Sequence, residues 1–322
     1  MARVAVIIPA CNSAATIALA IDSALAQTCN SIEVIVVDDG STDATPEIAA
    51  GYGDRIKLVR QRNRGPSIAR NNGLGAAGPS EYAAFLDADD VWMPNVVESL
   101  VGALDATPLS MLAFCDLIPI DSQGSVLEYS FIDYADAHAP TMEEMLSRWW
   151  PILTSAVLMR RTAFEKVGGF SEEFDLPGFE DPFLWLLMRE QGSFEYIDQP
   201  MVIYRTTPPL DRMMKYGKGF KTFARLVTAR YGAAGMRLVE QTGGRYGEVW
   251  TYHGLLALRE GNKLLARRAF ECALLYGDDR ARKRLRGRWL RTFLPAVLAR
   301  ALSGGFVHRA DRIEEYDSFF RI

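Results

Sequence analysis

The sequence Ile32-Glu-Val-Ile-Val-Val-Asp-Asp-Gly-Ser41 decides the class of fold. A run of β-branched residues without polar alternation predicts a strand that is buried on both faces, as in parallel sheets. The run Val4-Ala-Val-Ile-Ile-Pro9 predicts a second strand of the same kind. Residues 13–26 lie between the two strands with helical spacing, and Asn12 or Ser13 is expected to cap that helix.

The alternation of strands and helices continues downstream. We expect a helix, a strand, a helix and a strand at Thr42–Tyr52, Ile56–Arg60, Pro66–Leu74 and Tyr82–Leu86. Such alternation predicts an α/β fold with a doubly wound, mainly parallel sheet flanked by helices, which binds its ligand where the strands end. Further strands are expected at 111–118 and 155–159, and the pattern is helical from about residue 216. We therefore expect an α/β domain at 1–212 and a helical C-terminal extension at 213–322.

The composition narrows the class of protein. The chain has 322 residues, 49% of them hydrophobic, and a formal net charge of -4, so it lacks the basic character of a nucleic-acid-binding domain. Its four cysteines are scattered and form no C-x-x-C pair, which favours a reduced, cytoplasmic setting over a zinc site or a disulfide framework. No apolar run approaches the roughly 20 residues that cross a bilayer.

The segment Asp87-Ala-Asp-Asp90 directly follows the hydrophobic strand expected at Tyr82–Leu86. Two carboxylates at i and i+2 are costly at the end of a buried strand unless a cation lies between or near them. Hard oxygen ligands suit Mg²⁺ or Mn²⁺, so we interpret Asp87 and Asp89 as ligands of a divalent cation that also binds a diphosphate. The alternative is a solvated acidic loop.

Three other polar segments each have two interpretations. Asp38–Asp43 suits nucleotide contacts at a strand end, or an ordinary turn and helix cap. Pro66 opens a helix whose N–H groups, together with Arg64 and Arg70, favour a bound anion, and an exposed helix position explains Arg70 equally well. Glu180-Asp-Pro182 offers a carboxylate as a general base and is also typical of a helix N-terminus.

In their order and spacing, these motifs resemble the family 2 glycosyltransferases, which are inverting enzymes with the GT-A fold. The resemblance covers roughly residues 3–205, and its motifs are Ile7-Ile-Pro-Ala-Cys-Asn12, Val37-Asp-Asp-Gly-Ser-Thr-Asp43, Asn63-Arg-Gly-Pro-Ser-Ile-Ala-Arg-Asn71, Leu86-Asp-Ala-Asp-Asp90, Val167-Gly-Gly-Phe170 and Glu180-Asp181. It implies a nucleoside-diphosphate sugar as donor, with uridine preferred. It further implies that the sugar passes to a hydroxyl of a saccharide or lipid-linked acceptor, in the synthesis of cell-surface polysaccharide or glycoconjugate.

The resemblance also implies roles for single residues. Those expected at the nucleotide are Pro9, Asn12, Asp39, Arg70 and Asp87. Those expected at Mn²⁺ or Mg²⁺ are Asp89 and Asp87. Asp181 is expected to be the catalytic base, and Glu180 to contribute to acceptor binding.

Two positions depart from the family's pattern. Cys11 stands where many members carry Tyr or a similar residue, which changes the expected stacking on the base. Thr206-Thr-Pro208 follows Tyr204-Arg205 where many members carry a metal-binding His, so the resemblance identifies no third protein ligand. The Q-x-x-R-W signature of processive members is absent, which favours transfer of a single sugar.

Two other functions fit part of the sequence. A sugar nucleotidyltransferase also uses metal-bound acids on an α/β sheet, but Pro9-Ala-Cys-Asn12 stands where such enzymes have a Gly-rich loop with a basic residue. A non-catalytic glycosyltransferase-like binding protein has no need to retain Asp87, Asp89 and Asp181 together.

The segment 280–300 carries eight Lys and Arg residues and no acid. With Trp289, Leu290 and Phe293 interleaved, it predicts a basic amphipathic helix in peripheral contact with the cytoplasmic face of an anionic membrane. Pro295 would kink or split such a helix. A helix packed on the domain, with solvated arginines, explains the pattern equally well.

Overall fold

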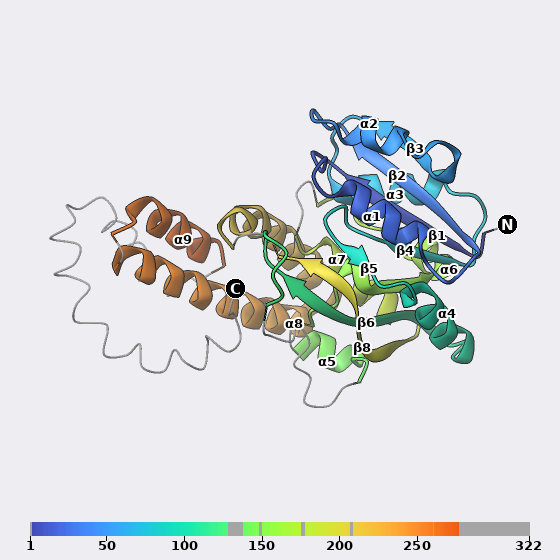
Figure 1. Cartoon of the computed structure of the whole chain (residues 1–322). Coiled ribbons are helices and arrows are strands. Elements are labelled where there is room, and N and C mark those ends of the chain that lie inside the picture. Colours follow the sequence, from blue (N-terminus) through green and yellow to red (C-terminus); the bar gives the residue numbers. More distant parts are fainter. Residues whose placement is uncertain are drawn as a thin grey trace. The chain divides into compact units, whose positions relative to one another are not determined.

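The computed structural model of the chain describes residues 2–127, 138–147, 150–174, 178–206, 209–259 and 261–276 (Figure 1). The chain divides into two compact units. The first comprises Met1–Met145 and Trp150–Thr206, and the second comprises Leu146–Trp149 and Thr207–Ile322. The boundary expected after residue 212 falls inside the helix that begins at Pro209.

The first unit is built on one mixed sheet with the strand order β3-β2-β1-β4-β7-β6-β8-β5. The strands are β1 (Val4–Ala10), β2 (Ile32–Asp39), β3 (Lys57–Gln61), β4 (Tyr82–Phe85), β5 (Val91–Trp92), β6 (Ser110–Ile120), β7 (Val157–Arg160) and β8 (Ser193–Arg205). β1 pairs in parallel with β2 and β4, as do β2 with β3 and β6 with β8. β7 runs antiparallel to β4 and β6, and β5 runs antiparallel to β8. The expected mainly parallel sheet flanked by helices is confirmed, with β7 and β5 as its antiparallel strands.

Helices and short 3-10 turns connect these strands. They are α1 (Ile17–Leu25), α2 (Thr45–Ala50), η1 (Gly53–Arg55), α3 (Pro66–Ala76), α4 (Val96–Ala106), α5 (Met142–Ser147), η2 (Thr154–Ala156), α6 (Arg161–Lys166) and α7 (Glu180–Arg189). The helices and strands expected before residue 90 are present within a few residues of their expected bounds. The largest differences lie at the first turns of α1 and α2, which begin three or four residues later than expected.

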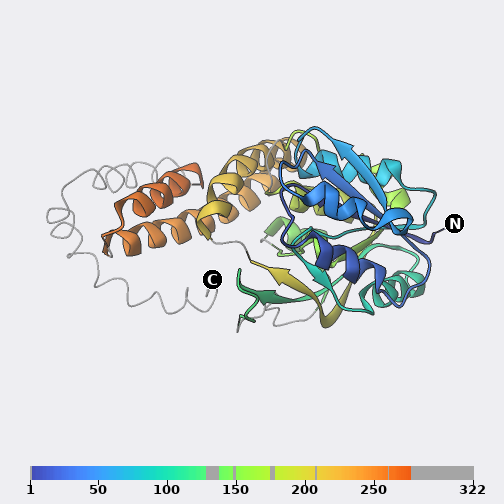
Figure 2. The ribbon, with the colours of Figure 1, turned by 45° about the horizontal axis from the view of Figure 1, so that its top comes forward.

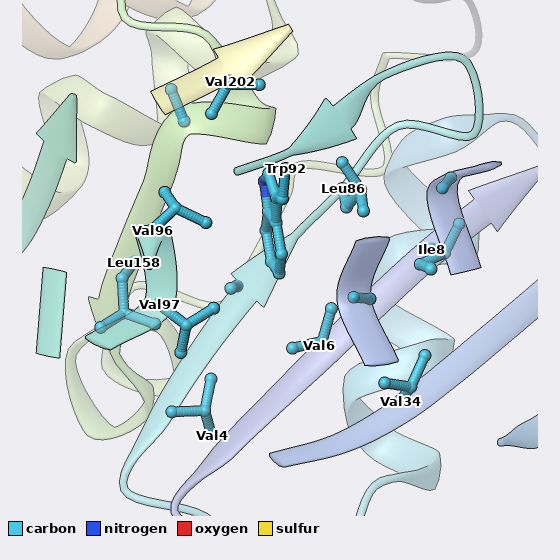
Figure 3. Packing of buried hydrophobic residues seen from close by; sticks show 14 of the residues in the cluster. Val4, Val6, Ile8, Val34, Leu86, Trp92, Val96, Val97, Leu158 and Val202 are labelled. Atoms are coloured by element: carbon cyan, nitrogen blue, oxygen red, sulfur yellow. The ribbon is translucent and has the colours of Figure 1, made fainter. Parts of the chain in front are cut away.

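Alternate residues of the central strands pack against helices on opposite faces of the sheet. Val6 of β1 belongs to a buried cluster with residues of α1 and α4, and Figure 3 shows the ring of Trp92 inside this cluster. Ile7, the next residue of β1, contacts α3 on the other face, where a Cβ built on Gly73 would lie 2.5 Å from its Cγ2 atom. Burial on both faces is what the unbroken apolar runs of β1 and β2 predict.

The expected cap of the first helix is wrong. Thr16 precedes α1 and makes no side-chain capping hydrogen bond. The side chain of Asn12 instead accepts a hydrogen bond from the backbone N–H of Thr42 at 2.8 Å. Asn12 therefore joins the loops after β1 and β2, because its oxygen reaches the neighbouring loop and not the first turn of its own helix.

The second unit contains a helical hairpin of α8 (Pro209–Arg259) and α9 (Lys263–Tyr276), which lie side by side in Figure 2. Gly232 has non-helical backbone angles and interrupts α8. Gly261 and Asn262 separate the helices as expected, and the Asn262 Oδ1 atom accepts a hydrogen bond from the Leu265 N–H at 3.1 Å. The side chain of Asn262 thus supplies the N-terminal cap of α9.

The hairpin is closely packed. A Cβ built on Gly254 of α8 would lie 2.5 Å from the ring of Phe270 on α9. Within the described residues, no helix has the length and the hydropathy that crossing a bilayer requires. The basic segment 280–300 lies outside the described residues.

Two glycines of α3 provide a matched test of its packing on the sheet. In Gly73→Ala the new methyl group would lie 2.5 Å from Ile7 and 2.8 Å from Val37, whereas Gly75 has no neighbouring atom within 4 Å. Alanine favours a helix over glycine by about 1 kcal/mol. We therefore expect Gly75→Ala to raise the free energy of unfolding by up to about 1 kcal/mol. We expect Gly73→Ala to lower it by about 1–3 kcal/mol through overpacking. Urea denaturation measures both, and equal effects would contradict this packing.

Candidate active site

The loops after β1 and β2 are joined by hydrogen bonds from backbone to side chains. The Asn12 N–H donates to Ser41 Oγ at 2.9 Å, and the Ala14 N–H donates to an oxygen of Asp43 at 3.0 Å. The hydroxyl of Thr45 donates a hydrogen bond to Asp43, and this bond is the largest cause of the lowered pKa of the Asp43 carboxyl. The two loops therefore form one unit at the carboxyl ends of the two strands.

Asp39 is buried at the end of β2 and organises the loop before α3. Its two carboxylate oxygens accept hydrogen bonds from the backbone N–H groups of Arg64 at 2.8 Å and Gly65 at 2.9 Å. The side-chain amide of Gln61 adds a third at 2.8 Å. These three bonds leave about one acceptor position of the carboxylate unused, on the oxygen that faces Gly65. The nucleotide contact expected for Asp39 stays a prediction.

Gly40 allows this loop to lie against the strand end. Its φ is +73°, and a Cβ there would lie 2.7 Å from the backbone nitrogen of Asn63. Asn63 in turn donates a hydrogen bond to the Sγ atom of the exposed Cys11 at 3.2 Å. Pro9 is half-buried in β1 and pairs with Val37 of β2. These contacts bring the first three sequence motifs together at one edge of the sheet.

Arg70 connects the loop after β4 to the start of α7. It lies on α3 with a side chain that is 5% exposed, and its guanidinium bonds Asp87 at 2.7 Å and Glu180 at 3.1 Å. Burial opposes the charge on Arg70, but the two carboxylates more than offset this and hold the pKa of the guanidinium above its ordinary value. The nucleotide contact expected for Arg70 stays a prediction, since its visible partners are acids of the protein.

Asn71 links α3 to the Gly-Gly-Phe motif. Its side chain donates to the Phe170 carbonyl at 2.8 Å and accepts from the Phe170 N–H at 3.0 Å. Gly169 has a φ of +73°, and a Cβ there would lie 2.7 Å from the Asn71 oxygen. The ring of Phe170 is thereby held under the Arg70 guanidinium, 5.1 Å from its carbon. The distant motifs at 63–71 and 167–170 are thus neighbours in the structure.

Asp181 lies in the first turn of α7, beside this bridge. Phe179 precedes the helix in the left-handed region at a φ of 72°, and the buried Glu180 carboxylate accepts from the Gly178 N–H. The hydroxyl of Thr154 approaches an Asp181 oxygen at 3.4 Å. Burial raises the pKa of Asp181 well above its ordinary value, and the charge of Glu180 raises it further.

Asp87 and Asp89 lie in the connection between β4 and β5, both half-buried. Arg70 occupies the Asp87 Oδ1 atom, and no described residue forms a hydrogen bond with its Oδ2 atom. Asp90, the next acid, is fully buried, and burial raises its pKa well above the ordinary value, as do the charges of Asp89 and Asp87. Asp87, Arg70 and Asp181 are close enough for charge to act between them.

The donor set fits a hard divalent cation that shares its coordination with a ligand. Asp87 and Asp89 supply carboxylate oxygens, the ligand type that Mg²⁺ and Mn²⁺ prefer. Among the described residues, no three His, Cys, Asp or Glu side chains are grouped as a complete metal site. The remaining coordination would therefore come from phosphate oxygens and water, as is common for Mg²⁺.

The sequence profile described as Glycosyl transferase family 2 matches residues 5–168. The chain belongs to this family. This family 2 chain is 33% identical over 206 residues to an uncharacterised glycosyltransferase of Rickettsia typhi, with 62% of each protein covered. It is 47% identical over 102 residues to the succinoglycan biosynthesis protein ExoO of Rhizobium meliloti, with 31% of this chain and 29% of that protein covered. The chain thus spans less than two thirds of the length of these relatives.

Solved structures confirm the expected GT-A fold. The family 2 chain superposes on S. aureus TarS in complex with UDP-GlcNAc with a TM-score of 0.60 and 16% identity, covering 94% of this chain and 92% of that one. The mannosyltransferase PcManGT of Pyrobaculum calidifontis, in complex with GDP-Man and Mn²⁺, gives a TM-score of 0.55 and 19% identity over 99% of this chain and 87% of that one. At these identities the likeness concerns the fold alone.

The sequence assigned no role to three residues of the site. Thr154 and Ser155 lie in η2, in front of the antiparallel strand β7, and reach Asp181 and Asp90. Arg205, the last residue of β8, reaches Asp90 through its backbone N–H. A single Thr, Ser or backbone group is too common for its type to mark a site, so only the topology reveals these contacts.

Removal of the Arg70 charge is expected to unpair a buried carboxylate. We expect Arg70→Met to lower the free energy of unfolding by about 3–5 kcal/mol, because Glu180 is then left without its partner. The double variant Arg70→Met/Glu180→Gln should lose at least about 1 kcal/mol less free energy of unfolding than the two single variants added together. The effects of substituting two residues in contact are not additive. Arg64→Met is the control. Its partner Glu172 and Arg64 itself are both more than half exposed, so the loss should stay below about 1 kcal/mol. Strict additivity in chemical denaturation would contradict the bridge.

Proposed function

We propose that this chain is an inverting glycosyltransferase that moves a sugar from a nucleoside diphosphate, most readily UDP, to a hydroxyl of a saccharide or lipid-linked acceptor. The observation that carries the proposal is the buried Arg70 bridge. It holds Asp87, which follows β4, and Glu180, which begins α7, on one guanidinium, and Asp181 lies beside it. A diphosphate-binding acid and a candidate base thereby belong to the same site.

The relatives support the kind of substrate. TarS is solved with UDP-GlcNAc and PcManGT with GDP-Man, so the same fold binds nucleotide sugars in both. The relative from Rhizobium meliloti is a succinoglycan biosynthesis protein, which supports a role in the synthesis of a cell-surface polysaccharide or a glycoconjugate. We assign UDP over GDP from the resemblance of the motifs alone.

We assign the role of general base to Asp181. The acceptor oxygen attacks the anomeric carbon while the bond from that carbon to the diphosphate oxygen breaks, and the hydroxyl proton passes to the Asp181 carboxylate. One displacement inverts the anomeric configuration. The raised pKa of Asp181 makes it a stronger base than an ordinary aspartate, and such catalysis typically contributes about 10²–10⁴-fold in rate. We assign a part in acceptor binding to Glu180, which Arg70 holds in place.

We assign the donor end of the site to Asp87 and Asp89, with Pro9, Asn12 and Asp39 shaping the nucleotide pocket. A bound Mn²⁺ or Mg²⁺ supplies positive charge to the diphosphate as it leaves. Asp87 is held in place through its Oδ1 atom by Arg70, so its second oxygen has a fixed direction. Asn12 and Asp39 act through the loops that they join.

The variant Asp181→Asn tests the base. We expect donor binding within about twofold of the wild type and a loss of transfer of about 10²–10⁴-fold, because the amide cannot take the proton. Transfer to water is measured as the slow hydrolysis of a panel of nucleotide sugars in the presence of Mn²⁺. The exposed acid Asp198 offers a control of the same chemistry, and Asp198→Asn should keep full activity. Near-normal transfer by Asp181→Asn would remove the assignment.

The same variant has a second, independent readout. Because the pKa of Asp181 is raised in the fold, stability falls as the pH rises from the ordinary aspartate pKa through the folded pKa, and the loss is complete above it. The amide of Asp181→Asn carries no charge at any of these pH values, so this loss of stability does not occur in the variant. Its melting temperature at a pH above the folded pKa should exceed that of the wild type by about 2–4 °C. A lower value would contradict the buried charge.

The variant Asp89→Asn tests the metal assignment. Isothermal titration of UDP with and without Mn²⁺ should show a gain in affinity with the metal for the wild type. The amide is a poorer ligand than the carboxylate for a hard cation, so the gain should shrink about tenfold or more in the variant. Affinity for UDP without Mn²⁺ should not change. An undiminished gain would assign the metal to other groups.

A further inference from the structure

Asp90 is a buried acid that the proposed reaction does not use. Its side chain is 1% exposed, although it directly follows the two candidate metal ligands. One carboxylate oxygen accepts the hydroxyl of Ser155 at 2.6 Å, and the other accepts the backbone N–H of Arg205 at 3.0 Å. Burying a carboxylate is costly, so a residue kept at this depth with both oxygens engaged has a specific task in the structure.

Ser155 passes this contact on to Asp87. The Ser155 Oγ atom, which donates to Asp90, accepts the backbone N–H of Asp87 at 3.0 Å. The Ser155 carbonyl accepts the indole N–H of the buried Trp92 at 2.6 Å, so the serine is held from a second side. The bonds form a directional chain from the Asp87 N–H through the Ser155 hydroxyl to the Asp90 carboxylate. Only an acceptor can end such a chain.

The second oxygen of Asp90 reaches the other side of the site. Arg205 ends β8, and its guanidinium donates to the carbonyls of Asp121 at 3.3 Å and Ser122 at 3.4 Å, just after β6. Asp90 therefore joins the acidic loop after β4 to the start of β7 and the end of β8. All three lie at the edge of the sheet where the parallel strands end.

We infer that Asp90 is a positioning residue, which fixes the backbone at Asp87 through Ser155 so that Asp87 and Asp89 present their oxygens to the cation and the diphosphate in one geometry. This inference rests on the proposed function of the site. In Asp90→Asn the amide keeps one acceptor oxygen, so either the Ser155 hydroxyl or the Arg205 N–H faces the amide nitrogen, which cannot accept a proton. Supporting residues of this kind typically change metal affinity by about 10–100-fold.

The test is isothermal titration of UDP, with and without Mn²⁺, to the full-length wild type, Asp90→Asn and Ser155→Ala. We expect the gain in affinity from Mn²⁺ to fall about tenfold or more in both variants. Affinity for UDP alone should stay within about twofold. Ser155→Thr keeps the hydroxyl and should restore a larger gain than Ser155→Ala, which a loss of packing alone would not produce.

Ser110→Ala is the matched control. Ser110 is also a buried serine that donates to a carboxylate, that of Glu195, but it lies at the start of β6, at the opposite edge of the sheet. The variant Ser110→Ala should lower the melting temperature and leave unchanged the gain in UDP affinity from Mn²⁺.

Two outcomes would overturn the inference in different ways. If Asp90→Asn lowers the melting temperature but keeps the full gain from Mn²⁺, Asp90 serves only the fold. If the wild type itself binds UDP with no gain from Mn²⁺, the metal assignment of the proposed function fails, and the inference about Asp90 falls with it.

Discussion

The neutralisation of the buried Glu180 and the half-buried Asp87 by Arg70 is the interaction on which the site depends. Glu180 would be costly at its depth without a cation, and Asp87 would repel it. A single guanidinium satisfies both, because its planar fork can bond two acids at once. Phe170 packs against the same group, and Asn71 fixes Phe170. The helix that carries Arg70 thus connects the loops after β1, β2 and β4 to α7.

The position of α3 also depends on places where its backbone, and that of the loop before it, lies close to the strands and loops of the sheet. Asp39 holds the residues before α3 by their N–H groups, and Gly40 has no side chain that would keep Asn63 away. Gly73 then brings the helix against Ile7 and Val37 of the sheet. The position of Arg70 is therefore set at both ends of its helix, by hydrogen bonds before the first turn and by tight packing near the last.

The sequence predicts the first half of the fold well because β1 and β2 have apolar runs and β2 ends in two acids. It predicts the grouping of Asp87, Arg70 and Glu180 only through the resemblance, since nothing in spacing relates residues so far apart. It assigns no role to Ser155 or to Arg205, whose contacts arise from the reversed direction of β7 and from a backbone N–H. The cap expected from Asn12 is wrong because a partner on the next loop outcompetes the helix.

The antiparallel direction of β7 has a consequence for how such enzymes diversify. Since β6 ends and η2 begins at the same edge of the sheet, the whole segment between Ile120 and Thr154 leaves and returns there. A change of length within this connection therefore does not by itself shift the register between β6 and β7. The length of this connection can therefore differ between related chains while the end of β6 and the start of β7 stay side by side.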